Sequence, residues 1–107
     1  MATYVLIESR SPWDSADVPY FYRLAEELAA SGNEVTLYLV QNGVLPARQG
    51  AQESGLASLS GKVKVLADDF SLRERAIAAA GLRQGVSAAS IEAVVDLLAS
   101  GAKAAWH

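Results

Sequence analysis

Two adjacent carboxylates, Asp68 and Asp69, have the residue types and position for chemistry. They follow a short apolar run at residues 63–66, whose β-branched residues predict a buried strand. Ser71 comes shortly after them and marks the expected start of a helix. In α/β proteins ligands bind where strands end and helices begin. We therefore expect any binding or catalytic group to lie in this segment.

The helix expected after these carboxylates has start and stop signals of its own. Ser71 lies three residues before Glu74, which is the spacing of a capping box. Gly81 follows Ala80 and can adopt the left-handed conformation that ends a helix. The pattern predicts a helix from Ser71 to Ala80.

Three interpretations of Asp68 and Asp69 are open. They can form a solvated turn, bind a ligand together with the exposed N–H groups of the helix start, or act as a general acid and base. The last role requires surroundings that separate the pKa values of the two carboxyl groups.

The remaining elements alternate between strands and helices. Apolar runs at residues 4–7 and 35–40 predict buried strands. Residues 82–86 form either a brief strand or only a connection, and residues 103–106 can form a terminal edge strand. Asp17 and Gly32 bound a first helix with Pro19 in its first turn, and Ser87 and Gly101 bound the last one. Residues 41–43 read as a turn and residues 44–60 as a broken helix. This order predicts a single α/β domain with a mostly parallel sheet of four or five strands, in the order 2-1-3-4-5.

That strand order places the ends of the first and third strands side by side. The polar loop after the first strand would then lie beside the two carboxylates, with Asn42 on the flank. The candidate ligand-binding residues are Ser9, Arg10, Ser11, Asn42, Asp68, Asp69 and Ser71. Trp13 and Tyr20 could cover this crevice, although single aromatic residues more often serve packing.

Two arginines and a tryptophan are candidates for contacts with another chain. Arg73 and Arg75 are about 200° apart around a helix, so they are not expected to bind one ligand. Arginine and tryptophan are enriched at interfaces, and Trp106 lies on the expected edge strand next to His107. We expect Arg73, Arg75 and Trp106 to face solvent or a neighbouring subunit.

Composition excludes several classes of function. The net charge is −3 and the nine basic residues form no run, which argues against nucleic-acid binding. No apolar stretch approaches the roughly 20 residues of a membrane span, and no signal-peptide pattern opens the sequence, so we expect a cytoplasmic protein.

With no cysteine and one histidine, we expect no disulfide, metal or cofactor. Apolar residues make up 51% of this short chain, which favours an oligomer.

Four segments together resemble one family. They are E-S-R-S-P-W-D-S-A-D after the first strand, Y-L-V-Q-N-G after the second, V-L-A-D-D-F-S-L-R-E-R-A-I after the third, and the closing K-A-A-W-H. Nearly the whole chain is similar to the DsrE/DsrF-like family, which includes sulfur-relay subunits of tRNA thiolation and sulfur oxidation. The resemblance implies a flavodoxin-like three-layer domain that assembles into trimers or hexamers, including hetero-oligomers with other DsrE-like subunits.

The chain departs from the family at its reactive position. Sulfur-carrying members have a cysteine after the third strand, and the matching position here falls near Asp68. Ala76 stands where the family usually has glycine. A carboxylate cannot carry sulfane sulfur, so this chain is not expected to be a persulfide carrier.

Two hypotheses follow. The chain is an oligomeric subunit that acts as a scaffold, binding or regulatory partner in sulfur metabolism. Alternatively, it is an enzyme or small-ligand-binding protein that uses the polar crevice at Asp68 and Asp69.

Overall fold

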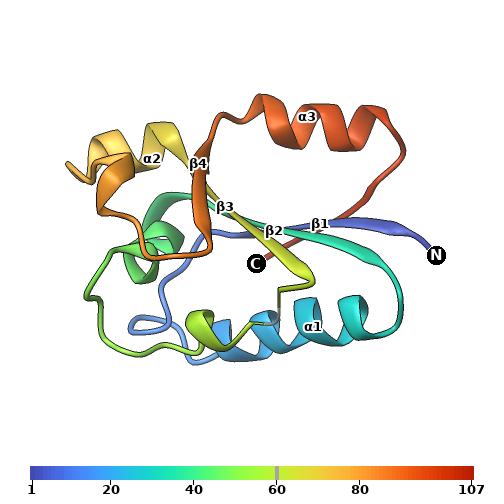
Figure 1. Ribbon diagram of the computed structural model, residues 1–107, viewed down its shortest axis with the longest axis horizontal. Helices are drawn as coiled ribbons and strands as arrows, with labels where there is room; N and C mark the ends of the chain where they lie inside the picture. Colours follow the sequence, from blue (N-terminus) through green and yellow to red (C-terminus); the bar gives the residue numbers. More distant parts are fainter. Residues whose placement is uncertain (60) are drawn as a thin grey trace.

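The computed structural model describes residues 1–59 and 61–107, which form a five-stranded parallel sheet between helices (Figure 1). The strands are β1 Thr3–Glu8, β2 Glu34–Leu39, β3 Val63–Asp68, β4 Val86–Ala89 and β5 Lys103–Trp106. The α/β, flavodoxin-like class is confirmed. The order of the strands is β4-β3-β2-β1-β5, so the expected order 2-1-3-4-5 is wrong.

Burial explains the observed order. The expected arrangement places β2 at an edge of the sheet, yet every residue from Val35 to Leu39 is buried. A strand that is apolar on both faces is covered only in the middle of a sheet. β4 and β5, which are mostly exposed or half-buried, occupy the two edges. β5 pairs with β1 and not with β4, and this brings the end of the chain beside the end of β1.

Helices cover both faces of the sheet. The α-helices are α1 Val18–Ala30, α2 Asp69–Glu74 and α3 Glu92–Ala99, and the short 3-10 segments are η1 Gln41–Ala47, η2 Leu56–Ser58 and η3 Ala79–Gly81. α1 lies on one face and α3 on the other (Figure 1). The larger apolar cluster lies on the α1 side and includes Leu6, Leu37 and Val65; the smaller lies on the α3 side and includes Val5 and Leu66.

The first helix matches its sequence signals. Asp17 precedes it, Pro19 lies in its first turn, and Gly32 follows it with a φ of +91°. The Asp17 side chain makes no capping hydrogen bond. Proline in the first turn loses no helical hydrogen bond, because the first N–H groups of a helix have no partner within it.

The helix expected from Ser71 to Ala80 begins earlier and ends earlier. α2 begins at Asp69, and the cap is Asp68, whose carboxylate accepts a hydrogen bond from the Ser71 N–H at 3.0 Å. The expected capping box of Ser71 with Glu74 is therefore wrong. Asp68, at the end of the strand and three residues before Ser71, supplies the side-chain oxygen that caps the helix.

The early end of α2 depends on an alanine in the left-handed conformation. Ala76 has a φ of +55°, and the Ile77 N–H donates back to the Leu72 carbonyl at 2.9 Å. This is the bonding of a Schellman helix end, which glycine usually provides. The turn directs Ile77 onto the apolar cluster of the α1 side.

Two further boundaries differ from the sequence interpretation. Ser87 does not cap the last helix, because it lies within β4; Ser90 instead accepts from the Glu92 N–H at 3.2 Å. In the turn after β2 the positive φ belongs to Gln41, at +52°, and not to the following Asn-Gly pair. Gly43 is required for space, since a side chain there would clash with the Glu8 carbonyl oxygen. The broken helix expected at 44–60 is seen as η1 and η2, with Ser60 outside the described residues.

Candidate functional site

Polar side chains gather at the carboxyl edge of the sheet, because the parallel strands all end there. They form two groups. The capping cluster comprises Tyr38, Asp68 and Ser71 with Asn42 and Arg75 around them. The Glu8–His107 pair lies at the ends of β1 and β5.

Asp68 is buried at the centre of the capping cluster. Its Oδ1 accepts from the Tyr38 hydroxyl at 2.7 Å, and its Oδ2 accepts from the Ser71 N–H at 3.0 Å and hydroxyl at 2.7 Å. Burial, and then the hydrogen bond to Asp68, raises the pKa of Tyr38 far above its usual value. Both carboxylate oxygens therefore hold the helix start and the second strand in place.

Two more predicted site residues belong to this cluster. The Ser71 hydroxyl accepts from the Gln41 N–H at 2.8 Å. Asn42 Oδ1 accepts from Arg75 Nε at 3.2 Å and Nη2 at 3.1 Å. Arg75, expected at an interface, is thus bonded within its own chain, and its Nη1 also donates to the Ser71 carbonyl at 3.2 Å.

Asp69 and Arg73 lie on the exposed side of α2. Their side chains form an ion pair at 3.6 Å, four residues apart along the chain. Pairs of this kind add only a few tenths of a kcal/mol to a helix, about 0.3–0.5. Neither side chain contributes to the buried part of the capping cluster.

The loop after β1 does not reach Asp68, because β2 lies between β1 and β3. The Ser9 hydroxyl donates to the His107 carbonyl at 2.8 Å, and the Arg10 N–H donates to Glu8 at 3.0 Å. The Ser11 N–H donates to Asp14 at 3.1 Å, and its hydroxyl accepts from the Trp13 N–H. The structure therefore brings together Asn42, Asp68 and Ser71, while Ser9, Arg10 and Ser11 lie with the other group.

The Glu8–His107 pair is the arrangement that sequence reasoning missed. The Glu8 side chain is fully buried, and both of its oxygens lie close to His107 Nδ1, at 2.8 and 2.9 Å. The imidazole is 24% exposed, and its ring centre lies 5.5 Å from that of Phe21. A carboxylate is rarely buried unless it is paired. One signal was available, since Glu8 directly continues an apolar run, but its partner follows only from the pairing of β5 with β1.

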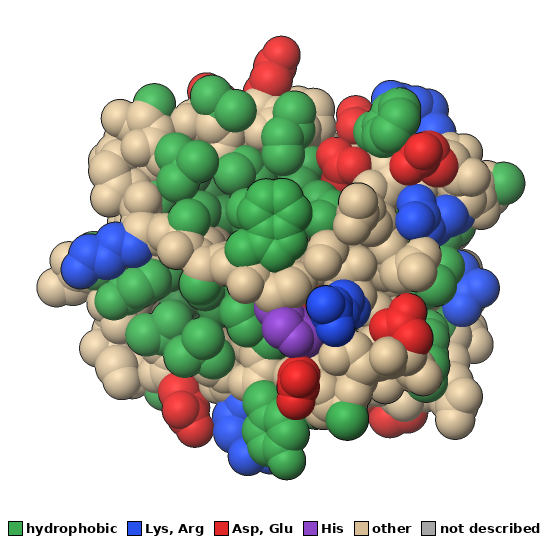
Figure 2. Space-filling view, turned by 180° about the vertical axis from the view of Figure 1, so that it is seen from behind, with side chains coloured by type: hydrophobic (Ala, Val, Ile, Leu, Met, Phe, Trp, Pro, Cys, Tyr) green, Lys and Arg blue, Asp and Glu red, His purple; other side chains and the backbone are tan. Residues whose placement is uncertain are grey.

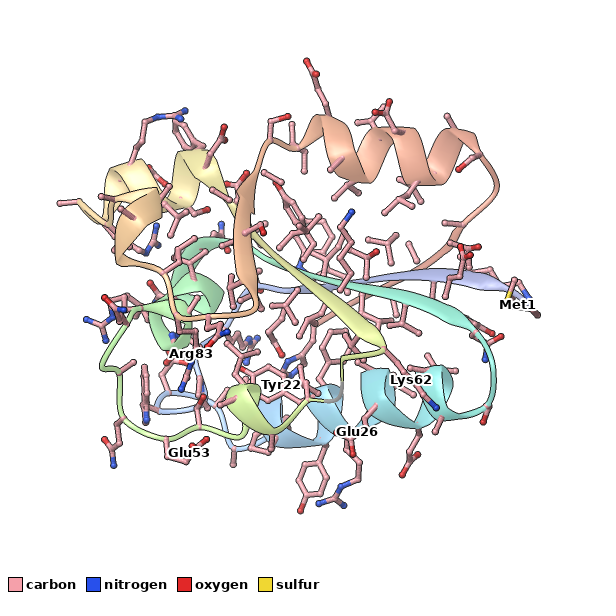
Figure 3. All side chains as sticks on the ribbon, viewed as in Figure 1. Met1, Tyr22, Glu26, Glu53, Lys62 and Arg83 are labelled. Atoms are coloured by element: carbon pink, nitrogen blue, oxygen red, sulfur yellow. The ribbon has the colours of Figure 1, made fainter. Side chains whose placement is uncertain are left out.

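A second buried polar group lies near this carboxylate. Tyr22 projects from α1 (Figure 3). Its hydroxyl is buried and has no hydrogen-bond partner among the described residues. Burial and then the charge of Glu8 raise the pKa of Tyr22 far above its usual value. The Ser54 side chain and Arg83 act in the opposite direction, and Ser54 lies near the hydroxyl without the geometry of a hydrogen bond.

An apolar surface surrounds the free edge of β5. Ile91, Val95, Leu98 and Trp106 are between 46% and 71% exposed, and we call them the β5-edge face. In α3 the opposite flank, with Ala93, Asp96 and Leu97, lines a depression over β2 and β3. Helical geometry therefore turns Ile91, Val95 and Leu98 toward the β5 side. Figure 2 shows hydrophobic side chains gathered across this face, with His107 (purple) at the border of the apolar area.

A groove of about 410 Å³ lies elsewhere, beside the amino ends of β3 and β4. Its lining includes Lys62 and Arg83, and none of the predicted site residues. No helix within residues 1–59 and 61–107 is both long and apolar enough to cross a membrane.

Comparison with known proteins supports the fold. No protein-family model and no curated protein matches the chain. It is similar to a solved structure of MTH1491, described as a protein of unknown function, from Methanobacterium thermoautotrophicum, with 19% identity, a TM-score of 0.85 and full coverage of both chains. It is also similar to the structure of the ychN protein from E. coli, with 20% identity, a TM-score of 0.88 and full coverage of both chains. These likenesses support a DsrE-like fold.

Proposed function

We propose that this chain is a cysteine-less oligomeric subunit with a DsrE-like fold, which acts as a scaffold, binding or regulatory partner in sulfur metabolism. Its role is to dock, either on further copies of itself in a trimer or hexamer or on other DsrE-like subunits. The fold is shared with MTH1491 and the ychN protein. The link to sulfur metabolism rests on the family resemblance of the sequence.

The observation that carries this proposal is the β5-edge face. Four large apolar side chains there are about half exposed or more, and the strand beside them has one side without a neighbouring strand. Exposed apolar patches of this kind mark interaction surfaces, and open strand edges pair with further strands.

The edge strand carries one charged residue. Natural edge strands are often guarded by a lysine that projects into solvent. The charged residue of β5 is Lys103, and its ammonium group lies 5.9 Å from the centre of the Tyr4 ring. Lys103 is exposed and lies beside Tyr4 of the neighbouring strand, and the other residues of β5 are uncharged.

The alternative function at Asp68 and Asp69 has less support. Both oxygens of Asp68 already accept hydrogen bonds from Tyr38 and Ser71. Asp69 is paired with Arg73 at the surface. A ligand at this position would have to replace bonds that hold the start of α2.

The mass of the assembly tests the proposal. Light scattering at micromolar concentration should give three or six times the chain mass of 11.3 kDa. Val95→Asp and Trp106→Asp should lower the mass, because each places a charge in the buried interface. Tyr20→Asp is the matched control, since Tyr20 is exposed outside the β5-edge face. A wild-type mass of one chain would contradict the homo-oligomer, and a mass unchanged in both face variants would place the interface elsewhere.

A further inference from the structure

We propose that Glu8 and His107 form an acid–base pair in which Nε2 of His107 is the general base for hydrolysis of an ester. The first supporting observation is the fixed orientation of the imidazole. Both Glu8 oxygens face Nδ1, Oε2 is held in addition by the Arg10 N–H at 3.0 Å, and the Phe21 ring packs against the imidazole. A carboxylate on Nδ1 selects the tautomer that carries its proton there, which leaves the Nε2 lone pair available.

The second observation is access. Nε2 has no hydrogen bond to any described residue, whereas Nδ1 does, and about a quarter of the side chain is exposed. The imidazole is thus partly open to solvent, while the carboxylate is fully buried. This is the division of roles in a catalytic carboxylate–histidine pair.

A purely structural role for the pair explains less. The end of β5 is already held by main-chain bonds, since the His107 carbonyl accepts from the Ser9 N–H at 2.9 Å and the His107 N–H donates to the Ile7 carbonyl at 2.9 Å. A buried ion pair adds little net stability, because burying the charges costs about as much as their attraction returns.

The surroundings favour a base over a metal ligand. Within the described residues no group of three histidine, cysteine, aspartate or glutamate side chains is placed to hold a metal ion. Phe21 forms one wall of the histidine environment, and in Figure 2 a Lys or Arg side chain lies directly beside the histidine. An acyl or aryl ester can pack against this aromatic ring.

The reaction is balanced by water alone. Nε2 takes a proton from water as its oxygen forms a bond to the acyl carbon. The bond from that carbon to the ester oxygen then breaks, and the alcohol leaves with a proton returned by the imidazolium. The products are an acid and an alcohol, and His107 regains its starting state.

Turnover of p-nitrophenyl acetate tests the proposal on the intact chain. The ester is used in fifty-fold excess over the protein. Each amine group of the protein can be acylated only once, so hydrolysis that continues beyond this point is catalytic. We expect the continuing rate to fall at least tenfold in His107→Gln and in Glu8→Gln, and to be unchanged in Glu27→Gln, a matched change at an exposed glutamate. A wild-type rate equal to that of His107→Gln would overturn the proposal.

A second measurement needs no variant and keeps the test valid where Glu8→Gln fails to fold. His107 is the only histidine, so its ring nitrogens can be assigned without ambiguity in ¹⁵N NMR spectra. Spectra recorded between pH 5 and pH 9 should show a neutral form with the proton on Nδ1 and a bare Nε2. A neutral form with the proton on Nε2 would overturn the proposal.

Discussion

At the scale of single residues, two buried tyrosines show how differently one hydroxyl group can be placed. Tyr38 donates to the Asp68 carboxylate, whereas the Tyr22 hydroxyl has no partner within the described chain. A hydrogen bond to a charged group contributes about 1.5–3 kcal/mol to stability, while an unpartnered buried polar group costs about 1–3 kcal/mol.

The same substitution should therefore have different effects at the two sites. Tyr38→Phe should lower the free energy of unfolding by about 1.5–3 kcal/mol, because it removes the bond to Asp68. Tyr22→Phe should leave that free energy unchanged or raise it by up to about 1 kcal/mol. Urea unfolding at one protein concentration measures both. A clear loss in Tyr22→Phe would mean that its hydroxyl is bonded, for example to an internal water molecule.

We also expect these two tyrosines to make the folded protein less stable at alkaline pH. The raised pKa of each means that the folded protein keeps the phenol protons at a pH where the unfolded chain has released them. The free energy of unfolding keeps its full value with respect to these two groups below about pH 10. Above that pH it falls by up to about 1.4 kcal/mol per pH unit for each tyrosine. Urea unfolding between pH 9 and pH 11 checks this. The double variant Tyr22→Phe/Tyr38→Phe should show a shallower fall, and an equally steep fall would assign the effect to other groups.

Ala76 offers a stabilising change. Ala76 has a left-handed backbone conformation, which costs alanine roughly 1 kcal/mol more than it costs glycine. Ala76→Gly should therefore raise the free energy of unfolding by up to about 1 kcal/mol. Ala78→Gly is the control, because Ala78 has a φ of −76° and a glycine there only gives the unfolded chain more freedom. A loss of stability in both variants would contradict the interpretation.

At the scale of elements, the start of α2 depends on one carboxylate and not on the other. Asp68 accepts three hydrogen bonds from β2 and α2, whereas Asp69 makes one exposed ion pair. The sequence analysis expected the loop of Ser9, Arg10 and Ser11 to lie beside both carboxylates. The structure assigns Asp68 the partners Tyr38 and Ser71, because β2 and not β1 is the neighbour of β3.

Asparagine substitutions separate the two carboxylates. Asp68→Asn should lower the free energy of unfolding by at least about 1.5 kcal/mol, since charge-assisted bonds become neutral and one amide group cannot accept. Asp69→Asn should change it by no more than about 0.5 kcal/mol. Urea unfolding of each single variant is the measurement. Equal small effects would mean that the capping cluster does not hold α2.

Elements with strong local signals were predicted well, and those that depend on neighbours were not. The first helix has its proline and its terminal glycine where expected. The second helix was misjudged at both ends, because an aspartate took the capping role and an alanine accepted the left-handed conformation. At the last helix, Ile91, Val95 and Leu98 face outward, and Val94 is the buried residue of α3.

At the scale of the whole molecule, a DsrE-like fold is combined with a chain that has no thiol. We expect no transfer of persulfide sulfur from a cysteine desulfurase to this protein. After incubation with a labelled sulfur donor, mass spectrometry should show no added sulfur that a reductant removes. A stable addition of one sulfur per chain would contradict this expectation.

The amino-acid sequence by itself determined the α/β class, the three apolar strands of the sheet centre, the first helix, and the absence of cysteine from the chain. These properties depend on local periodicity, on turn residues and on composition. Only the tertiary structure decided the order of the strands, because that order depends on which strands must be covered on both faces. The strand order in turn selects the partners of the polar groups at the strand ends. It places Tyr38 against Asp68, and it joins Glu8 to a histidine 99 residues away.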